Sequence, residues 1–210
     1  NDVDLGSRPE GRARQTDGAQ RKKESGDTKF EDLNGDGVIS DDNEDRTMIG
    51  KPNPDWIVGL TVAADWNGFD LSAFFQGSFG ADVFDALRRY ELAAVNYTSD
   101  ALERWTGPGT SNSMPRIVLG DTPKNFRPST LLVHDASFLR LRNLQVGYTL
   151  PAQLTRKAYI QRLRFYASFD NLLTITGYKG MDPEIGSTMG IDKGVYPQAR
   201  VYTFGLNLTF

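Results

Sequence analysis

The stretch WIVGLTVAADWNGFDLSAFFQGSF (residues 56–79) decides the fold, because apolar and polar residues alternate along it on both sides of a turn. A period of two residues is that of a β-strand whose successive side chains point to opposite faces. Asn67-Gly68 is a strong hairpin signal, since both central positions of a type I′ turn need positive φ. Residues 56–66 and 69–79 are therefore predicted to form a β-hairpin.

Three later segments show the same alternation, and they cover about 137–150, 162–170 and 200–210. In the first of them the phase slips, because Leu139 and Leu141 are odd whereas Val146 and Tyr148 are even. One extra residue near Arg142-Asn143 would reconcile the two halves, so a β-bulge is predicted there. The chain as a whole is predicted to be all-β.

The connections alternate between short and long. Short ones follow residue 66 and residue 150, whereas residues 80–136 and 172–199 form long loops. A helix is predicted near 82–95, because four apolar residues recur there at helical spacing. Strands of about 10 residues with alternating short and long connections are typical of a transmembrane β-barrel. A soluble β-sandwich, whose core would hide the apolar faces, is the alternative.

Composition excludes several functions. The 210 residues contain no cysteine, which rules out thiolate chemistry and a Cys-based zinc site, and one histidine, His134, which rules out a metal cluster of several histidines. The net charge of −3 gives no basic surface for nucleic acid. The basic run within residues 1–27 is interpreted as part of a solvated loop without a core. No organic cofactor and no enzymatic activity are expected.

Eight blocks of the sequence resemble successive blocks of the SusC/RagA family of TonB-dependent transporters. They are GDTKFEDLNGDGVI (26–39), DRTMIGKPNPDW (45–56), GFDLSAFFQGSFG (68–80), RW (104–105), SFLRLRNLQVGYTLP (137–151), LRFYASFDNLLTIT (163–176), GYKGMDPE (177–184) and YPQARVYTFGLNLTF (196–210). The blocks keep the family's order and correspond to its C-terminal end. Phe210, after alternating apolar residues, looks like the signal that barrel-insertion machinery recognises.

The resemblance implies a fold and partners. The family has a multi-pass barrel of about 22 antiparallel strands in the Gram-negative outer membrane, with a plugged lumen. It implies residues 1–55 as an extracellular loop region and residues 56–210 as the five C-terminal barrel strands with long extracellular loops. The implied partners are the remainder of the barrel and its plug domain, a SusD-like lipoprotein lid, the TonB complex and outer-membrane lipid. Because the chain starts at Asn1 without a signal peptide, it is expected to be a piece of a longer protein.

The segment DLNGDGVIS (32–40) follows the template of a calcium-binding loop. That template needs oxygen ligands at alternate positions, glycine at the sixth and a backbone carbonyl at the seventh. These positions fall on Asp32, Asn34, Asp36 and Val38. Position twelve is Asn43, and relative to the family pattern the segment looks lengthened, so Asp45 is the candidate for the last carboxylate. Rival carboxylates are Asp41, Asp42 and Glu44, and a metal-free Asx-rich turn is the alternative to Ca²⁺.

The function that the resemblance implies is outer-membrane import of oligosaccharides or oligopeptides together with a lipoprotein. A soluble secreted β-sandwich that acts as a binding module with a calcium loop is the alternative, and an extracellular hydrolase is a weaker third. Five polar residues on the predicted strands are candidates to line a solute path or to hydrate the barrel wall. They are Asp70, Gln76, Arg162, Arg164 and Asp170. The sequence does not separate glycan from peptide.

Overall fold

A computed structural model of the chain describes residues 24–39, 45–88, 90, 92, 96–184 and 189–210. They form two compact units. The sheet unit comprises Pro52–Val83, Asp135–Gly190 and Gly194–Phe210. The loop unit comprises the described residues of Asn1–Lys51, Phe84–His134 and Ile191–Lys193.

Most regular structure is strand. The strands are β1 (Trp56–Trp66), β2 (Phe69–Phe79), β3 (Asp82–Asp85), β4 (Val133–Asp135), β5 (Phe138–Thr149), β6 (Arg162–Thr176), β7 (Ile191–Asp192) and β8 (Val201–Thr209). The helices are α1 (Ala152–Thr155) and the 3₁₀ turns η2 (Ser99–Glu103), η3 (Leu119–Asp121), η4 (Thr130–Leu132) and η5 (Arg156–Ala158). Within the described part of the chain, none of these helices has both the length and the apolar character of a membrane span.

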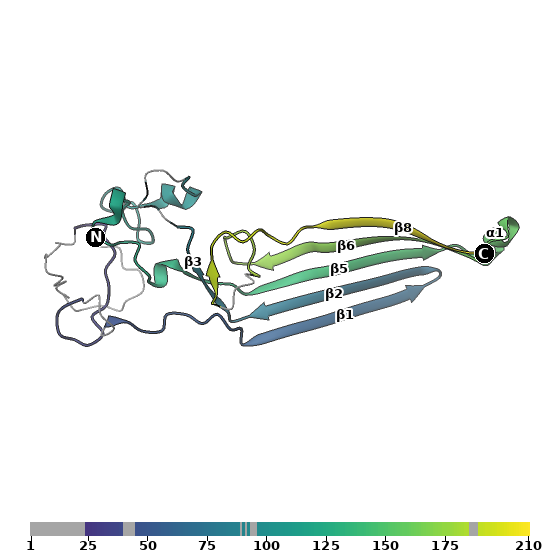
Figure 1. Cartoon of the computed structure of the whole chain (residues 1–210), viewed down its shortest axis with the longest axis horizontal. Coiled ribbons are helices and arrows are strands. Elements are labelled where there is room, and N and C mark those ends of the chain that lie inside the picture. The colour runs from purple at the N-terminus through teal and green to yellow at the C-terminus, as the bar shows by residue number, and fades with distance from the viewer. Residues whose placement is uncertain (1–23, 40–44, 89, 91, 93–95, 185–188) are drawn as a thin grey trace. The chain divides into compact units, whose positions relative to one another are not determined.

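The five long strands form one antiparallel sheet in the order β1-β2-β5-β6-β8 (Figure 1). The β1–β2 hairpin closes with Trp66 opposite Phe69. Asn67 (φ 47°) and Gly68 (φ 85°) form its turn, and both have the positive φ that a two-residue hairpin of this type requires. The predicted hairpin is confirmed with its predicted bounds.

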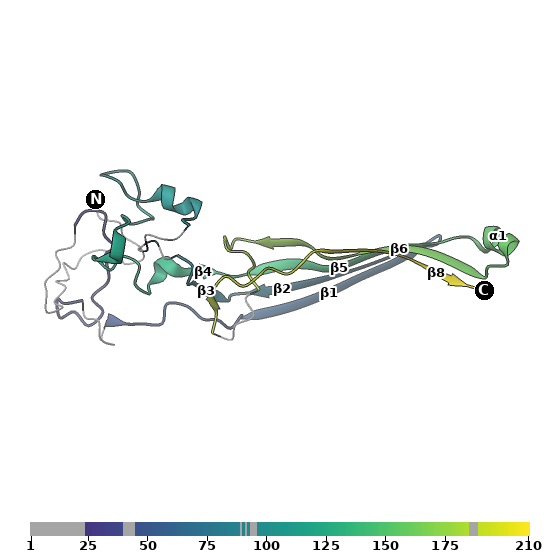
Figure 2. The same ribbon diagram turned by 45° about the horizontal axis from the view of Figure 1, so that its top comes forward.

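The predicted β-bulge is also confirmed. Phe74 pairs with Asn143 and Phe75 pairs with Leu141, which leaves Arg142 as the extra residue of β5. The pairing of β5 with β6 shifts at the same place, between Leu141 and Asn143. A bulge re-aims the side chain of its extra residue and increases the local twist. Figure 2, turned from the first view, shows the strands of the twisted sheet crossing one another.

The register gives the sheet two different faces. One face, called the apolar face here, is formed by side chains that the register aligns across all five strands, among them Val58, Leu71, Val146, Phe165 and Leu206. Many of these side chains are exposed; Phe165 is 48% exposed and Leu206 58%. The other, polar face carries Asp70, Ser72, Gln76, Arg140, Asn143, Gln145, Arg164, Ser168, Asp170 and Thr174.

The short connections lie at one end of the sheet. The β1–β2 turn and the β5–β6 connection, which contains α1 and η5, are both found there (Figure 1). Because adjacent strands are antiparallel, the β2–β5 and β6–β8 connections leave from the opposite end. The alternation of short and long connections predicted from the sequence is therefore confirmed, but the loop predicted over residues 172–199 is wrong at its start, because β6 continues to Thr176.

The helix predicted near residues 82–95 is wrong at its start. Residues Asp82–Asp85 form strand β3, in which Phe84 and Asp85 pair in parallel with Ile191 and Asp192 of β7. With β4, these strands make a sheet of order β4-β3-β7. A partner about a hundred residues away in sequence thus overrides the local helical spacing. Residues 89, 91 and 93–95 lie outside the described residues.

The loop unit has a small core of its own. Tyr90, Ala101 and Met114 are buried together, and Ile117 and Phe126 pack against them. The hydroxyl groups of Tyr90 and Thr98 lie 2.7 Å apart, which gives the buried phenol a hydrogen-bond partner. This unit therefore has packed contacts although it contains little regular structure.

Candidate functional site

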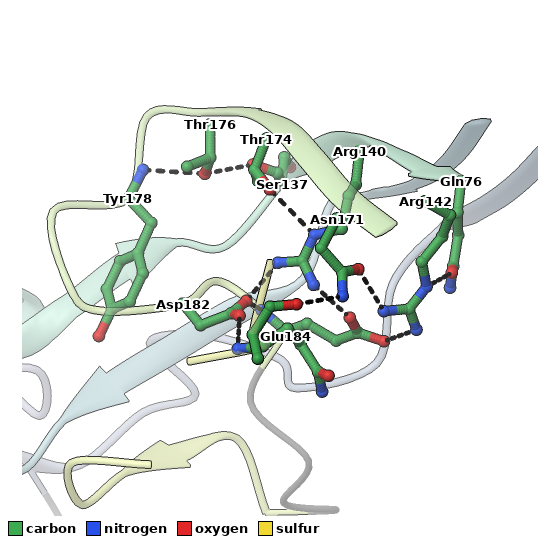
Figure 3. Close-up of polar contacts among 12 residues, drawn as sticks. Gln76, Ser137, Arg140, Arg142, Asn171, Thr174, Thr176, Tyr178, Asp182 and Glu184 are labelled. Carbon is green, nitrogen blue, oxygen red and sulfur yellow. Dashed lines mark hydrogen bonds and ion pairs between the residues drawn. The ribbon is translucent and has the colours of Figure 1, made fainter. Parts of the chain in front are cut away.

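A cluster of charged side chains lies on the polar face of the sheet, near the end from which the long connections leave (Figure 3). Arg140 and Arg142 come from β5, and Asp182 and Glu184 come from the connection between β6 and β7. These four residues are called the arginine cluster below. The cluster ties a loop of the sheet unit to the wall formed by its strands.

Arg140 is the centre of this cluster and is 2% exposed. Its Nη2 donates to Asp182 Oδ1 at 2.5 Å, and its Nη1 donates to Glu184 Oε2 at 2.9 Å. Its Nε donates to the hydroxyl oxygen of Thr174 on β6 at 3.0 Å. A buried guanidinium is tolerated only where its charge is paired and its donors are satisfied, and these contacts do both.

Arg142 joins the cluster because it is the extra residue of the bulge. Its Nη2 donates to Glu184 Oε1 at 3.0 Å, and its Nε donates to Gln76 Oε1 at 2.8 Å. Its Nη1 lies 3.3 Å from Asn171 Oδ1. In a regular strand, residues 140 and 142 share a face and residue 143 takes the other, whereas here Asn143 returns to the polar face. The bulge therefore places Arg140, Arg142 and Asn143 on the same face of the sheet.

Asp182 holds both ends of the loop. Its two carboxylate oxygens accept hydrogen bonds from the backbone N–H groups of Glu184 and Gln198, each at 2.9 Å. Burial raises the pKa of Asp182, but the two backbone hydrogen bonds and the Arg140 guanidinium outweigh burial and hold this pKa below its ordinary value. Asp182 is therefore held as a charged carboxylate, which is the form that accepts the hydrogen bonds from Arg140 and the two backbone N–H groups.

The five predicted polar candidates do not gather at one point. Arg164 on β6 donates twice to the Asp70 carboxylate, at 2.9 and 2.5 Å, and Gly147 between them leaves the space that this pair occupies. Asp170 accepts from Asn143 at 2.7 Å, Gln76 belongs to the surroundings of the arginine cluster, and Arg162 is exposed. Asp70, Gln76, Arg164 and Asp170 therefore have hydrogen-bond partners along one face.

The predicted calcium loop folds as a tight Asx-rich turn. The Asp32 carboxylate accepts from the N–H groups of Gly35 and Gly37, both at 2.7 Å. Asn34 Oδ1 accepts from the Asp36 N–H at 3.0 Å, and Asp36 Oδ1 accepts from the Val38 N–H at 2.7 Å. Asp45 Oδ1 accepts from the Leu33 N–H at 3.1 Å. The fold of this segment thus brings Asp45, the candidate for the last calcium ligand, beside the start of the loop at Leu33.

These donors are carboxylate, amide and carbonyl oxygens, which suit a hard cation such as Ca²⁺. No group of three or more His, Cys, Asp or Glu side chains arranged to hold a metal ion is found among the described residues. The rival carboxylates of Asp41, Asp42 and Glu44 lie outside the residues that the structure describes. Calcium binding stays a prediction.

A second arginine-carboxylate anchor lies in the loop unit. Asp27 accepts from Arg116 Nε at 2.6 Å and from the side-chain amide of Asn125 at 3.0 Å, and Asn125 is fully buried. Burial raises the pKa of Asp27, but the hydrogen bonds, led by that from Arg116, lower it below the ordinary value. The prediction that residues 1–27 are part of a solvated loop is wrong for Asp27, which is 3% exposed; residues 1–23 lie outside the described residues.

Curated relatives match most of this chain. TonB-dependent receptor P3 of Formosa agariphila is 36% identical over 192 residues, which are 86% of this chain and 19% of that protein. TonB-dependent receptor SusC of Bacteroides thetaiotaomicron is 32% identical over 183 residues, which are 86% of this chain and 17% of that protein. The chain thus spans about a fifth of the length of the curated relatives that it matches.

Solved structures agree with the sequence relatives. The RagAB peptide importer in its 'closed-closed' state matches with a TM-score of 0.65 and 31% identity, over 81% of this chain and 19% of that chain. A structure of the RagAB peptide transporter matches with a TM-score of 0.62 and 34% identity, over 75% and 17%. No protein-family model matches the chain.

The sheet is antiparallel, twisted and built of long strands, apolar on one face and polar on the other, which is the pattern of strands in the wall of a membrane β-barrel. Its sequence and fold match the C-terminal barrel portion of TonB-dependent receptors. The chain is a relative of the SusC/RagA receptors, as the eight sequence blocks predicted.

Sequence reasoning missed the arginine cluster. The phase slip at Arg142 predicts the bulge but does not by itself predict the direction of the Arg142 side chain. The block GYKGMDPE contains Asp182 and Glu184, and an acidic pair in a loop does not by itself identify a partner. The available signal was that two arginines lie two residues apart on one strand and that the second of them, Arg142, is the extra residue of the predicted bulge.

Proposed function

We propose that this chain forms part of the wall of a TonB-dependent outer-membrane importer that takes up oligosaccharides or oligopeptides with a SusD-like lipoprotein. The observation that carries the proposal is the exposed apolar face, which runs across all five long strands. Soluble monomers rarely expose contiguous apolar patches above a few hundred Å². Lipid is the environment that such a face fits.

The strands have the dimensions that this role needs. A membrane β-strand takes about 9–11 residues at a tilt of about 45°. The five long strands contain 11, 11, 12, 15 and 9 residues. The polar face would then line the lumen, where the arginine cluster and the Asp70–Arg164 pair meet water, solute or the plug.

The lengths of the connections support one orientation. Barrels of this class have short periplasmic turns and longer extracellular loops. The β1–β2 turn and the β5–β6 connection would therefore face the periplasm, and residues 1–55, 80–136 and 177–199 would lie outside the cell. A lipoprotein lid would meet these outer loops, and the plug and the TonB complex would act from the inner side.

The β-sandwich alternative fits the strands less well. A sandwich divides its strands between two sheets that cover each other's apolar faces. The five long strands belong to a single sheet, and side chains such as Phe204, which is 76% exposed, remain uncovered. The relatives are named as receptors and importers rather than enzymes, which supports a non-enzymatic role.

Uptake by intact cells tests this function. Cells that express the receptor should accumulate a fluorescent oligosaccharide or oligopeptide, and a protonophore that removes energy for TonB coupling should stop this accumulation. Cells without the receptor are the control. Recovery of the receptor in the soluble fraction without detergent would contradict the proposal and favour the secreted binding module.

We further propose that residues 32–45 bind Ca²⁺ through Asp32, Asn34, Asp36, the Val38 carbonyl and Asp45. The contact of Asp45 with the Leu33 N–H supports this assignment, because it brings a carboxylate from the far end of the segment to the loop. Without a cation these carboxylates repel one another, so metal binding is expected to order the loop.

Limited proteolysis tests the calcium site. In millimolar Ca²⁺, trypsin should cleave after Arg46 more slowly than it does in a chelator. Asp32→Ala with Asp36→Ala should remove this protection, whereas Glu31→Gln, a neighbouring acid outside the template, should keep it. Equal cleavage of the unaltered receptor with and without Ca²⁺ would contradict the proposal.

A further inference from the structure

A cavity of about 190 Å³ opens in the sheet unit, at the end of the sheet that carries the long connections. Its strand walls are Ile57 of β1, Ser78 of β2 and Phe138 of β5, which the register places side by side on the polar face. Pro52, Pro54 and Pro183 complete much of the remaining wall. The cavity therefore lies on the face that the proposed function assigns to the lumen.

The arginine cluster fixes one polar group of this cavity. Arg142 Nε donates to Gln76 Oε1 at 2.8 Å (Figure 3), which leaves the amide nitrogen of Gln76 outside this contact. No hydrogen bond of this nitrogen, or of the Ser78 hydroxyl two residues along the strand, is found within the described part of the chain. Both groups line the cavity and are able to donate to an oxygen inside it.

The charges around the cavity select against anions. Among the residues that the structure describes, Glu184 and Asp82 belong to the lining, whereas no lysine or arginine does. The two cluster arginines lie behind the wall, where Asp182 and Glu184 pair with them. A carboxylate entering the cavity would meet acidic groups and find no cation in the wall.

The size and the wall chemistry point to one residue of a longer chain. Pockets for whole small ligands begin at about 300 Å³, which is larger than this cavity. Most lining side chains are aliphatic, proline or phenylalanine, and the polar ones are the donors Gln76 and Ser78 and the carboxylates Asp82 and Glu184. Such a site suits an aliphatic side chain beside a main-chain carbonyl better than a sugar ring, whose hydroxyls need polar partners all round.

We propose that this cavity is a subsite for one uncharged aliphatic residue of an oligopeptide, with Gln76 and Ser78 donating to its main-chain carbonyl. The proposal rests on the proposed import function and narrows its substrate class to peptides. Arg142 is a positioning residue here, because it orients Gln76 and does not itself line the cavity.

Binding of capped peptides to the intact detergent-solubilised receptor tests the subsite. The probes are capped pentapeptides Gly-Gly-X-Gly-Gly, uncharged with leucine or serine at X and negatively charged with glutamate, and maltohexaose is the glycan arm. Calorimetry should give a dissociation constant for the leucine peptide at least about 10-fold lower than for the serine peptide, since even one methylene in an apolar pocket discriminates by that factor. The glutamate peptide should bind most weakly.

Two serines on the same face of β2 provide a matched pair. Ser78→Leu fills the cavity and should abolish the preference for leucine, whereas Ser72→Leu, which lies outside the cavity, should preserve it. If Ser78→Leu does not fold, Ser78→Ala should weaken all the peptides about 2- to 10-fold, the effect of one lost hydrogen bond, against no change for Ser72→Ala.

The outcomes separate the subsite from the import function. Equal behaviour of the Ser78 and Ser72 variants, or Ser78-dependent binding of maltohexaose without peptide binding, would overturn the subsite while energy-dependent uptake still stands. Failure of uptake itself would overturn the proposed function. Peptide binding with the same preference for leucine in Ser78→Leu would show that the residue is bound elsewhere.

Discussion

The two faces of the five-stranded sheet are built on different principles. On the polar face, side chains satisfy one another: Arg140 alone makes three hydrogen bonds and is 2% exposed. On the apolar face, large side chains such as Phe165 and Leu206 remain exposed and have few partners in the chain. The arginine cluster of the polar face thus finds its partners within the described residues, whereas the apolar face depends on its surroundings.

This difference predicts which changes the sheet tolerates. Substitutions on the polar face should act through the side chains that they leave unpaired. Substitutions on the apolar face should act through transfer of the new side chain to lipid. The following predictions are arranged from the largest expected effect to the smallest.

Removal of Arg140 should have the largest effect. Arg140→Ala leaves the buried Asp182 carboxylate without its cation, and loss of one partner of a buried ion pair costs about 3–5 kcal/mol. The loop should detach locally, so the backbone amides of Glu184 and Gln198, which Asp182 now protects, should exchange hydrogen much faster. The exposed Arg162→Ala is the control, and unchanged exchange in Arg140→Ala would contradict the assigned role.

A charge on the apolar face should be the next most costly change. Val146 and Gln145 are adjacent on β5 and point to opposite faces. Val146→Arg should lower the free energy of unfolding in lipid vesicles by about 2–4 kcal/mol, the range for arginine facing lipid near the membrane midplane. Gln145→Arg should change it by less than about 1 kcal/mol. Equal losses for the two variants would show that the faces do not differ in environment.

Acid should release the loop from the polar face. Because the pKa of Asp182 is lower in the folded protein than in the unfolded chain, its contribution to stability is present above the ordinary aspartate pKa of about 3.9. That contribution is lost as the pH falls through the lowered pKa. Amide exchange at Gln198, corrected for the intrinsic effect of pH, should therefore rise below about pH 4, and Asp182→Asn should remove this dependence.

The Asp70–Arg164 pair should matter least. Its side chains are 29% and 12% exposed, and partly exposed ion pairs contribute about 0.2–1 kcal/mol. Asp70→Asn should therefore lower the free energy of unfolding by less than about 1 kcal/mol at moderate ionic strength. A loss as large as that of Arg140→Ala would contradict this prediction and would mean that the Asp70–Arg164 pair is shielded from water as fully as the arginine cluster.

Local signals explain how much of this fold the sequence predicts. The Asn67-Gly68 turn, the alternation along the strands and the phase slip at Arg142 each depend on a few neighbouring residues, and all three are confirmed. The helix predicted near 82–95 is partly wrong, because Phe84 pairs with Ile191, a contact that local spacing does not reveal.

The candidate site was less predictable than the sheet. Arg140 and Asp182 are 42 residues apart, and the loop that joins them has no periodic pattern. The calcium motif was visible because its ligands follow one another closely in sequence, yet metal binding stays a prediction. A motif whose residues lie close together in sequence can be recognised from the sequence alone. Contacts between polar side chains of distant segments depend on how those segments pack, which the sequence pattern does not show.

The central claim is that the apolar face of the sheet contacts lipid and the polar face contacts water, and spin labels test this claim directly. Because the chain has no cysteine, a nitroxide can be attached to single cysteines introduced at Phe165 and Leu206 on the apolar face and at Ser72 and Ser168 on the polar face. In the membrane-embedded receptor, labels on the apolar face should collide mainly with oxygen, which concentrates in lipid. Labels on the polar face should collide relatively more with a water-soluble nickel chelate. Equal accessibility on both faces, or the reverse pattern, would contradict the assignment of this sheet to a barrel wall.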